Sequence, residues 1–215
     1  MKKYKFAVFD LDGTLLDTLD DLTAAVNHAL KKYNLPERTV TEVAAFLGNG
    51  AGKLIELSTP DGQNNPYFKD ILAEFKKYYA ENNSVYTKPY EKIPYVLNEL
   101  TKQGIKIALV SNKFDLAVKE LEKKYFDGIF SSAVGECDGI KRKPAPDLVF
   151  KAMKIMDAEK ENTVYIGDSE VDIKTAENCG TDCISVSWGF RNREELIKSG
   201  GKIIIDKPEE LLKFF

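Results

Sequence analysis

The chain has 215 residues, of which 43% are hydrophobic and 30% charged, and its formal net charge is -3. These values are those of an ordinary globular protein, which excludes collagen, coiled coil and intrinsic disorder. The length allows one good core, or one core with a small additional lobe. The slightly acidic balance gives no reason to expect nucleic acid as a partner.

Membrane and export signals are missing from the pattern. No apolar stretch approaches the roughly 20 residues needed to cross a bilayer. The segment Met1-Lys2-Lys3 runs into an apolar strand pattern without the apolar region of a signal peptide. We therefore expect a cytoplasmic protein that does not associate with membranes.

Cysteine and histidine usage excludes further chemistries. The chain has three cysteines and no Cys-x-x-Cys pair, so we expect reduced thiols and neither a disulfide framework nor a zinc site. His28 is the only histidine, which argues against serine-histidine hydrolases and multi-histidine metal sites. Because it falls in a helical pattern far from any nucleophile signal, we expect His28 to be structural.

The first predicted element is a buried strand at 6–9, an aromatic and β-branched run that stops on Asp10, Asp12 and Gly13. Side chains two positions apart on an extended backbone point the same way, so both acids should emerge together at the carboxyl end of the strand. Open parallel sheets bind their ligands at that edge. The alternative is a plain Asp-Gly turn followed by a capping threonine.

The pattern then becomes helical. Apolar residues with helical spacing predict helices at about 19–30, 40–57 (interrupted by Gly48-Asn49-Gly50) and 67–82. The first of these helices begins with Thr18-Leu19-Asp20-Asp21, which predicts a capping box. No strand pattern occurs between about residues 18 and 84. We interpret residues 17–84 as an all-helical domain inserted after the first strand.

Strands and helices alternate from residue 85 onward. The predicted strands are 105–110, 128–134, 163–166, 183–187 and 202–205, and the predicted helices are about 91–103, 114–125, 141–156, 169–178, 194–198 and 208–214. Such alternation favours βαβ units in an open parallel sheet with helices on both faces, a Rossmann-like α/β fold. Residues 1–16 and 85–215 would form this core domain.

Polar groups follow three of these strands: Asp10 with Asp12, then Ser111, then Asp168. The carboxyl ends of parallel strands share one edge, so these side chains should meet in one crevice. Oxygen ligands of this kind suit Mg²⁺. A hydroxyl and the ammonium of Lys143 could bind phosphoryl oxygens.

A carboxylate such as that of Asp10 can attack phosphorus, while a second one donates a proton and later activates water. Each feature also has a structural explanation: Ser169 to Asp172 could be a capping box, Ser111 a helix start, and Lys143 part of a basic surface. Those explanations do not say why the groups gather at strand ends.

Four segments together resemble, in order and spacing, the motifs of the haloacid dehalogenase (HAD) superfamily: Asp10-Leu11-Asp12-Gly13-Thr14-Leu15-Leu16-Asp17-Thr18, Val110-Ser111-Asn112-Lys113, Lys143-Pro144-Ala145-Pro146 and Gly167-Asp168-Ser169-Glu170-Val171-Asp172. The resemblance covers the whole chain, with residues 17–84 similar to the family's small helical cap. It implies an aspartyl-phosphate mechanism with Asp10 as nucleophile and Asp12 as general acid and base. The dehalogenase branch lacks this second aspartate.

The resemblance also implies the remaining site residues. Mg²⁺ would be held by Asp10, the backbone carbonyl of Asp12 and Asp168, with Asp172 in support. The phosphoryl group would be bound by Ser111, Asn112 and Lys143, inside a loop shaped by Gly13 and Thr14.

Within the superfamily, Gly48-Asn49-Gly50, Tyr90-Glu91-Lys92-Ile93 and Trp188-Gly189-Phe190-Arg191 are similar to the phosphoglycolate phosphatase group. Pyrophosphatases, nucleotidases and sugar phosphatases share parts of this pattern, and a β-phosphoglucomutase-type mutase or a receiver-like signalling module are further alternatives. Lys53, Asn49 and Gly50 are candidate cap contacts for an anionic substrate, although Gly48-Asn49-Gly50 could be a plain turn. The expected partner is a small phosphate ester, and the chain could be a monomer or a homodimer.

Overall fold

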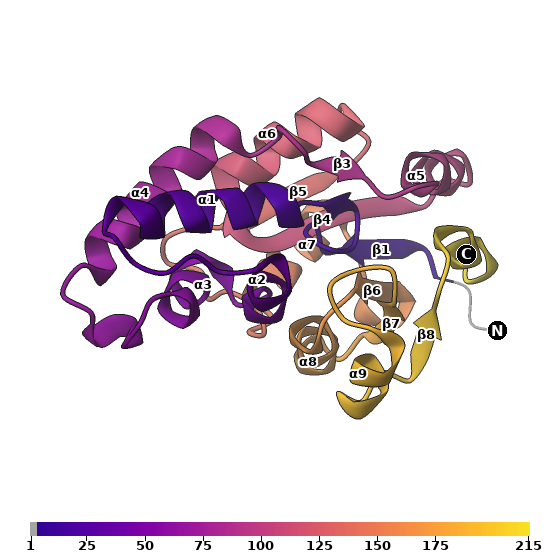
Figure 1. Cartoon of the computed structure of the whole chain (residues 1–215). Coiled ribbons are helices and arrows are strands. Elements are labelled where there is room, and N and C mark those ends of the chain that lie inside the picture. Colours follow the sequence, from indigo (N-terminus) through magenta and orange to yellow (C-terminus); the bar gives the residue numbers. More distant parts are fainter. Residues whose placement is uncertain (1–3) are drawn as a thin grey trace. The chain divides into compact units, whose positions relative to one another are not determined.

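A computed structural model describes residues 4–215, so Met1-Lys2-Lys3 lies outside the described residues. The chain divides into two compact units, Met1–Leu16 with Pro89–Phe215 and Asp17–Lys88. The chain passes between the units at the two short strands β2 (Leu16–Asp17) and β3 (Lys88–Pro89), which pair with each other (Figure 1). The second unit thus ends at Lys88, a little beyond the predicted residue 84.

The first unit is built on a six-stranded sheet. Its strands are β1 (Phe6–Phe9), β4 (Lys106–Phe114), β5 (Ser132–Glu136), β6 (Thr163–Gly167), β7 (Asp182–Val186) and β8 (Ile203–Ile205). The order is β5-β4-β1-β6-β7-β8, and neighbouring strands in this order pair in parallel. Phe9 lies opposite Leu109 on one side and Ile166 on the other, so β1 ends level with the middle of β4 and near the end of β6.

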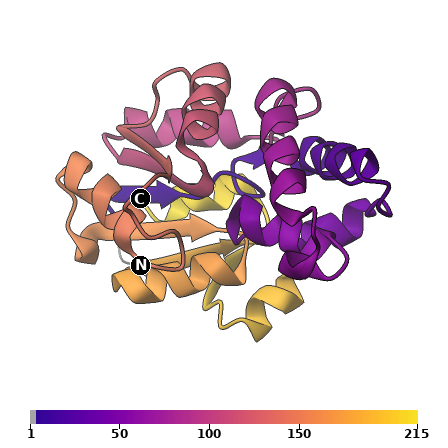
Figure 2. The same cartoon turned by 90° about the vertical axis from the view of Figure 1, so that its left-hand side faces the viewer.

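Helices cover both faces of this sheet (Figure 2). They are α5 (Ile93–Lys102), α6 (Asp115–Phe126), α7 (Asp147–Met156), α8 (Glu170–Cys179) and α9 (Arg193–Lys198), with short 3-10 turns η2 (Lys160–Asn162) and η3 (Pro208–Lys213). Side chains alternate between the faces because the period of a strand is two residues. Phe9 packs in the cluster that includes α5 and α6, whereas Val8 packs in the one that includes α7 and α8.

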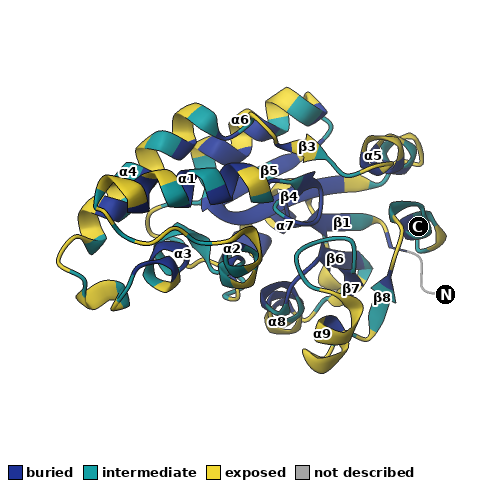
Figure 3. Cartoon of the chain, viewed as in Figure 1, coloured by how far each residue is buried: buried dark blue, intermediate teal, exposed yellow. Residues whose placement is uncertain are grey.

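The central strands are buried on both faces (Figure 3). Phe9 and Val8 are both fully buried, and full burial of such a side chain contributes about 1.5–3 kcal/mol. Strands covered on both sides read as continuous apolar runs, which is the pattern that predicted them. The predicted α/β fold class is confirmed.

Two strands differ from the prediction by more than one residue at an end. The strand predicted at 105–110 continues as β4 through Ser111 to Phe114, with a register irregularity against β5 between Val110 and Phe114. The next strand, predicted at 128–134, is β5 at Ser132–Glu136. Polar residues were taken to end the first strand, but Ser111, Asn112 and Lys113 are buried, so the strand remains extended through them.

The second unit contains helices α1 (Leu19–Lys32), α2 (Val40–Phe46), α3 (Gly50–Ser58) and α4 (Phe68–Asn82), and the 3-10 turn η1 (Gly62–Asn64). The capping box predicted at Thr18 is wrong, because Thr18 makes no side-chain capping hydrogen bond. The Asp21 carboxylate instead accepts hydrogen bonds from the backbone N–H groups of Tyr86 and Thr87. These two donors lie 65 and 66 positions away from Asp21 in the sequence, near the end of the unit.

His28 has the structural setting expected of it. Its Nε2 lies 3.1 Å from Glu74 Oε1, and its ring stacks on Tyr78 with centroids 3.9 Å apart. These contacts join α1 to α4 within the helical unit. Among residues 4–215, no helix has the length and apolar character needed to span a bilayer.

Candidate active site

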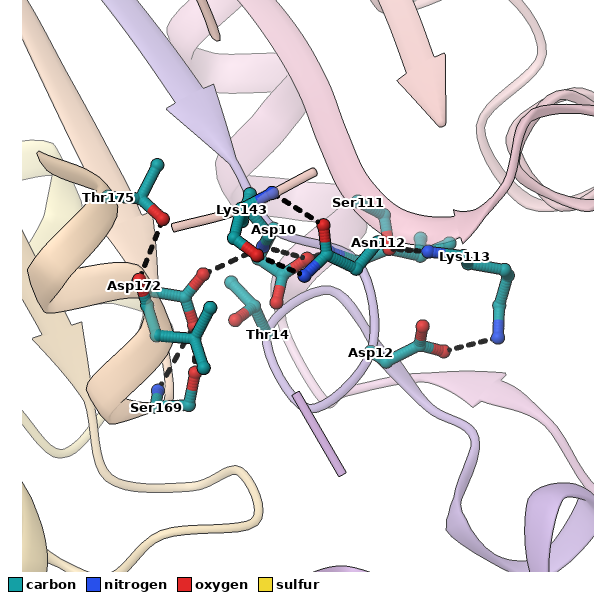
Figure 4. A network of polar contacts seen from close by, with 12 residues as sticks. Asp10, Asp12, Thr14, Ser111, Asn112, Lys113, Lys143, Ser169, Asp172 and Thr175 are labelled. Carbon is teal, nitrogen blue, oxygen red and sulfur yellow. Dashed lines mark hydrogen bonds and ion pairs between the residues drawn. The ribbon is translucent and has the colours of Figure 1, made fainter. Parts of the chain in front are cut away.

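The predicted site residues of the core gather at one edge of the sheet (Figure 4). Asp10 follows β1 directly, and its backbone N–H donates to the Ile166 carbonyl oxygen of β6 over 2.9 Å. Asp168 follows β6, and Ser111 lies in β4 on the other side of β1. Because β1 is central, the edge brings together residues more than 150 positions apart in sequence, as the strand-end pattern predicted.

Lys143 lies between two carboxylates in the interior. Its Nζ is 2.9 Å from Asp10 Oδ1 and 2.8 Å from Asp172 Oδ1, and the side chain is 2% exposed. Nζ also donates to the hydroxyl of Tyr165, which donates in turn to Asp172. Burial by itself would lower the pKa of Lys143, but Asp10 and Asp172 outweigh it and raise that pKa above its usual value. The ammonium is therefore charged at neutral pH.

Asn112 fixes the segment that carries this lysine. Its side-chain amide donates to the Lys143 carbonyl oxygen over 2.9 Å and accepts from the Lys143 N–H over 2.8 Å. The reciprocal pair ties the end of β4 to a loop 31 positions further along the chain. This contact gives Asn112 a positioning role, while the phosphoryl contact implied by the resemblance stays a prediction. Ser111 is buried beside it, and its Oγ accepts from the Lys113 N–H.

Three carboxylates form a buried acidic group: Asp10, Asp168 and Asp172 offer ligand oxygens that all lie within 4.8 Å of one another. Burial, with a contribution from Asp172, raises the pKa of Asp10 to about 7, although Lys143 opposes the shift. Burial and Asp172 likewise raise the pKa of Asp168 well above its ordinary value. Like charges at this distance ionise together only with cations beside them, and Lys143 supplies one positive charge against three negative ones.

This group fits a hard divalent cation. Its donors are all oxygens, which Mg²⁺ prefers, and it carries more negative charge than its neighbouring ammonium neutralises. Asp168 is oriented by the N–H of Phe190, which donates to Oδ2 over 2.7 Å, and by the more distant hydroxyl of Thr14. Asp172 accepts from the N–H and the hydroxyl of Ser169 as in the alternative capping-box interpretation, and it holds Lys143 as well.

The Asp12 side chain does not belong to this group. Its Oδ1 lies 2.8 Å from the Nζ of Lys113, which is 5% exposed. Lys113 lies within one of the sequence motifs, but the pattern indicated no role for it. Tyr165 was not expected at the site either, because a tyrosine inside an apolar strand carries no local signal of a polar partner.

Two glycines, Gly13 and Gly189, pack so closely at the site that a side chain at either position would collide with its neighbours. Gly13 has a φ of +82°, and a Cβ there would lie 2.3 Å from Asp168 Oδ2. A Cβ on Gly189 would lie 2.2 Å from the Gly13 carbonyl oxygen. The indole N–H of Trp188 donates to the Thr14 carbonyl oxygen over 3.0 Å. The segment 188–190, noted in the sequence only as a subgroup resemblance, thus packs directly on the site.

The three predicted cap residues lie in the helical unit. Asn49 precedes α3, and Gly50 begins it with a φ of +77°. Lys53 pairs with Glu56 one turn later at 2.5 Å. Their contact with substrate, and the role of this unit as a cap, stay predictions.

Comparisons with known proteins agree with the motifs. The family of haloacid dehalogenase-like hydrolases matches residues 7–186. A protein of Aquifex aeolicus named phosphoglycolate phosphatase is 35% identical over 211 residues, which are 96% of this chain and 94% of that protein. One of Pseudomonas syringae pv. syringae with the same name is 29% identical and matches 97% of this chain and 78% of its own length.

Solved structures give the same result. A crystal structure from Lactobacillus delbrueckii subsp. bulgaricus, of a candidate phosphoglycolate phosphatase, has a TM-score of 0.93, 37% identity and 97% coverage of both chains. A predicted phosphoglycolate phosphatase from Haemophilus somnus has a TM-score of 0.91 and 28% identity, and the match covers 99% of this chain and 98% of that one. The chain belongs to the haloacid dehalogenase-like hydrolase family. The predictions of the family and of an enzyme, a hydrolase of the phosphatase type, are confirmed.

Proposed function

We propose that this enzyme is a Mg²⁺-dependent phosphomonoester hydrolase that acts through an aspartyl-phosphate on Asp10, with phosphoglycolate as its substrate. The observation that carries the proposal is the buried Asp10 carboxylate, 2.9 Å from the Lys143 ammonium and within a group of three acids. The Aquifex aeolicus protein that matches along 94% of its own length is named phosphoglycolate phosphatase, and this name supports the substrate.

The chemistry would proceed in two steps. An Asp10 oxygen attacks phosphorus as the bond to the ester oxygen breaks, and Asp12 gives a proton to that departing oxygen. Water then attacks the aspartyl-phosphate, Asp12 accepts a proton from it, and the Asp10 carboxylate is restored as inorganic phosphate leaves. No co-reactant other than water is required.

Four other residues would support these steps. The Lys143 ammonium and the Ser111 hydroxyl would bind phosphoryl oxygens where negative charge develops. Asp172 would keep Lys143 in place, since it holds the same ammonium at 2.8 Å. Asp10 and Asp168, with the Asp12 backbone carbonyl, would hold the Mg²⁺. When bound, the ion would neutralise the acids and draw electron density from the phosphoryl oxygens.

The test is an assay of phosphate release from phosphoglycolate and p-nitrophenyl phosphate with Mg²⁺. We expect Asp10→Asn to abolish turnover, and Asp12→Asn to lower kcat by roughly 10²–10⁴, the usual value of general acid-base catalysis. Asp138→Asn changes an exposed acid after β5 and serves as the matched control. Appreciable turnover by Asp10→Asn, or an unchanged rate in Asp12→Asn, would contradict the assigned roles.

A panel of phosphate esters ranked by kcat/KM decides the substrate. Phosphoglycolate should rank above pyrophosphate, nucleotides and sugar phosphates. Isomerised sugar phosphate in place of free phosphate would instead indicate a mutase.

A further inference from the structure

A second lysine lies at the proposed site, on the side away from the acidic group. Lys113 extends from β4 to Asp12, with Nζ 2.8 Å from Oδ1. In Figure 4, Asp172 and Ser169 lie on one side of Asp10, and the Lys113–Asp12 pair lies on the other. The two lysines therefore have different surroundings: Lys143 contacts Asp10 and Asp172, whereas Lys113 contacts Asp12.

The position of Asp12 relates Lys113 to the leaving group. In the proposed mechanism Asp12 hands its proton to the ester oxygen, so that oxygen must come within about 2.6–3.2 Å of the carboxylate. The Lys113 ammonium, in contact with the same carboxylate, then lies within roughly 6–8 Å of the ester oxygen. A charged group two bonds beyond that oxygen can approach the ammonium closely.

The Lys113 ammonium is a positive charge close to the leaving group and attracts an anionic one, whereas Asp12, which gives up its proton in the proposed first step, adds no attraction. Both side chains are shielded from water, at 5% exposure for Lys113 and 18% for Asp12. Charges act more strongly on one another there than in bulk solvent.

We propose that Lys113 is a specificity-determining residue that selects esters whose leaving group carries a carboxylate next to the ester-bearing carbon. The inference rests on the proposed function and adds to it a residue and a chemical class of substrate. Esters with a neutral leaving group should be poorer substrates, and esters with a cationic one poorer still.

Three esters of nearly equal size test this inference: 2-phosphoglycolate, 2-hydroxyethyl phosphate and phosphoethanolamine, which are anionic, neutral and cationic in the leaving group. For the wild-type enzyme with Mg²⁺, we expect kcat/KM for phosphoglycolate to exceed that for 2-hydroxyethyl phosphate at least tenfold. Lys113→Met removes the charge and keeps the length, and it should reduce that ratio to below about threefold. Lys113→Arg should retain the preference.

The matched control is Lys123→Met, which removes an exposed lysine from α6 and should leave the ratio unchanged. An equal loss on all three esters in Lys113→Met would mean that Lys113 acts only by positioning Asp12, and it would overturn the proposal. Hydrolysis of the esters by the wild type without a charge preference would overturn it too, whether or not the variant folds. No hydrolysis of any ester would reject the proposed function itself.

Discussion

Replacing Asp10 with Asn should stabilise the metal-free protein above about pH 7, although it removes the proposed nucleophile. In the folded chain Asp10 shares a buried site with Asp168 and Asp172, and Lys143 is the ammonium that contacts this group. The substitution removes one of three negative charges. It does not leave Lys143 without a carboxylate partner, because the contact with Asp172 at 2.8 Å is kept.

The size of the effect follows from the pKa of Asp10, which burial and Asp172 raise from 3.8 to about 7. The shift is about 3 units, and each unit corresponds to 1.36 kcal/mol, which gives about 4 kcal/mol. The folded state binds the Asp10 proton more tightly than the unfolded chain does. The contribution of this proton to the free energy of unfolding is therefore fully present below about pH 4 and is lost as the pH rises to about 7. Asparagine is neutral throughout and suffers no such loss.

Urea unfolding with EDTA, from about pH 4 to about pH 8, measures the difference. The only tryptophan, Trp188, lies in the core unit against Thr14, so its fluorescence reports on the unit that contains the site. The two proteins should be similarly stable at about pH 4, and Asp10→Asn should be more stable by about 4 kcal/mol at about pH 8. Asp138→Asn should follow the wild type, and added Mg²⁺ should narrow the gap by stabilising the wild type more. An Asp10→Asn protein no more stable than the wild type at about pH 8 would refute the reasoning.

Two further substitutions test the packing and the hydrogen bonds of the site. Gly189→Ala places a Cβ 2.2 Å from the Gly13 carbonyl oxygen and 2.5 Å from Asp168 Oδ2. Thermal and urea unfolding should show a loss of stability of about 1–3 kcal/mol, and kcat should fall at least about tenfold. Gly52→Ala, where a Cβ meets nothing within 4 Å, should reduce neither stability nor kcat, and an equal effect of both substitutions would count against the explanation. Tyr165→Phe removes the hydroxyl that joins Lys143 to Asp172. Its free energy of unfolding should fall by about 1–3 kcal/mol. A change below about 0.5 kcal/mol, the range of ordinary surface substitutions, would mean that the hydroxyl is dispensable for stability.

Local patterns were sufficient for the elements and for several site residues. The apolar run at 6–9 predicted β1 and placed Asp10 directly after it, because a strand has a fixed period and direction. The same reasoning brought Ser111 and Asp168 to the edge shared with Asp10. The Asp12 side chain does not emerge together with that of Asp10 as expected, because the strand ends at Phe9 and Asp12 contacts Lys113. The boundaries of β4 and β5 were less well predicted, because polar residues that end a strand in water can continue it when they are buried.

The sequence by itself determined that Asp10 and Asp168 follow their strands and lie at the same edge as Ser111, since this depends only on local periodicity and on the rule that parallel strands share an edge. Which groups those residues contact was decided by the tertiary structure. Lys113 meets Asp12, Tyr165 meets Lys143, and Gly189 packs on Gly13 across separations of 101, 22 and 176 positions. No pattern within one element encodes such contacts, because they arise only when the sheet brings distant strands and loops to the same edge.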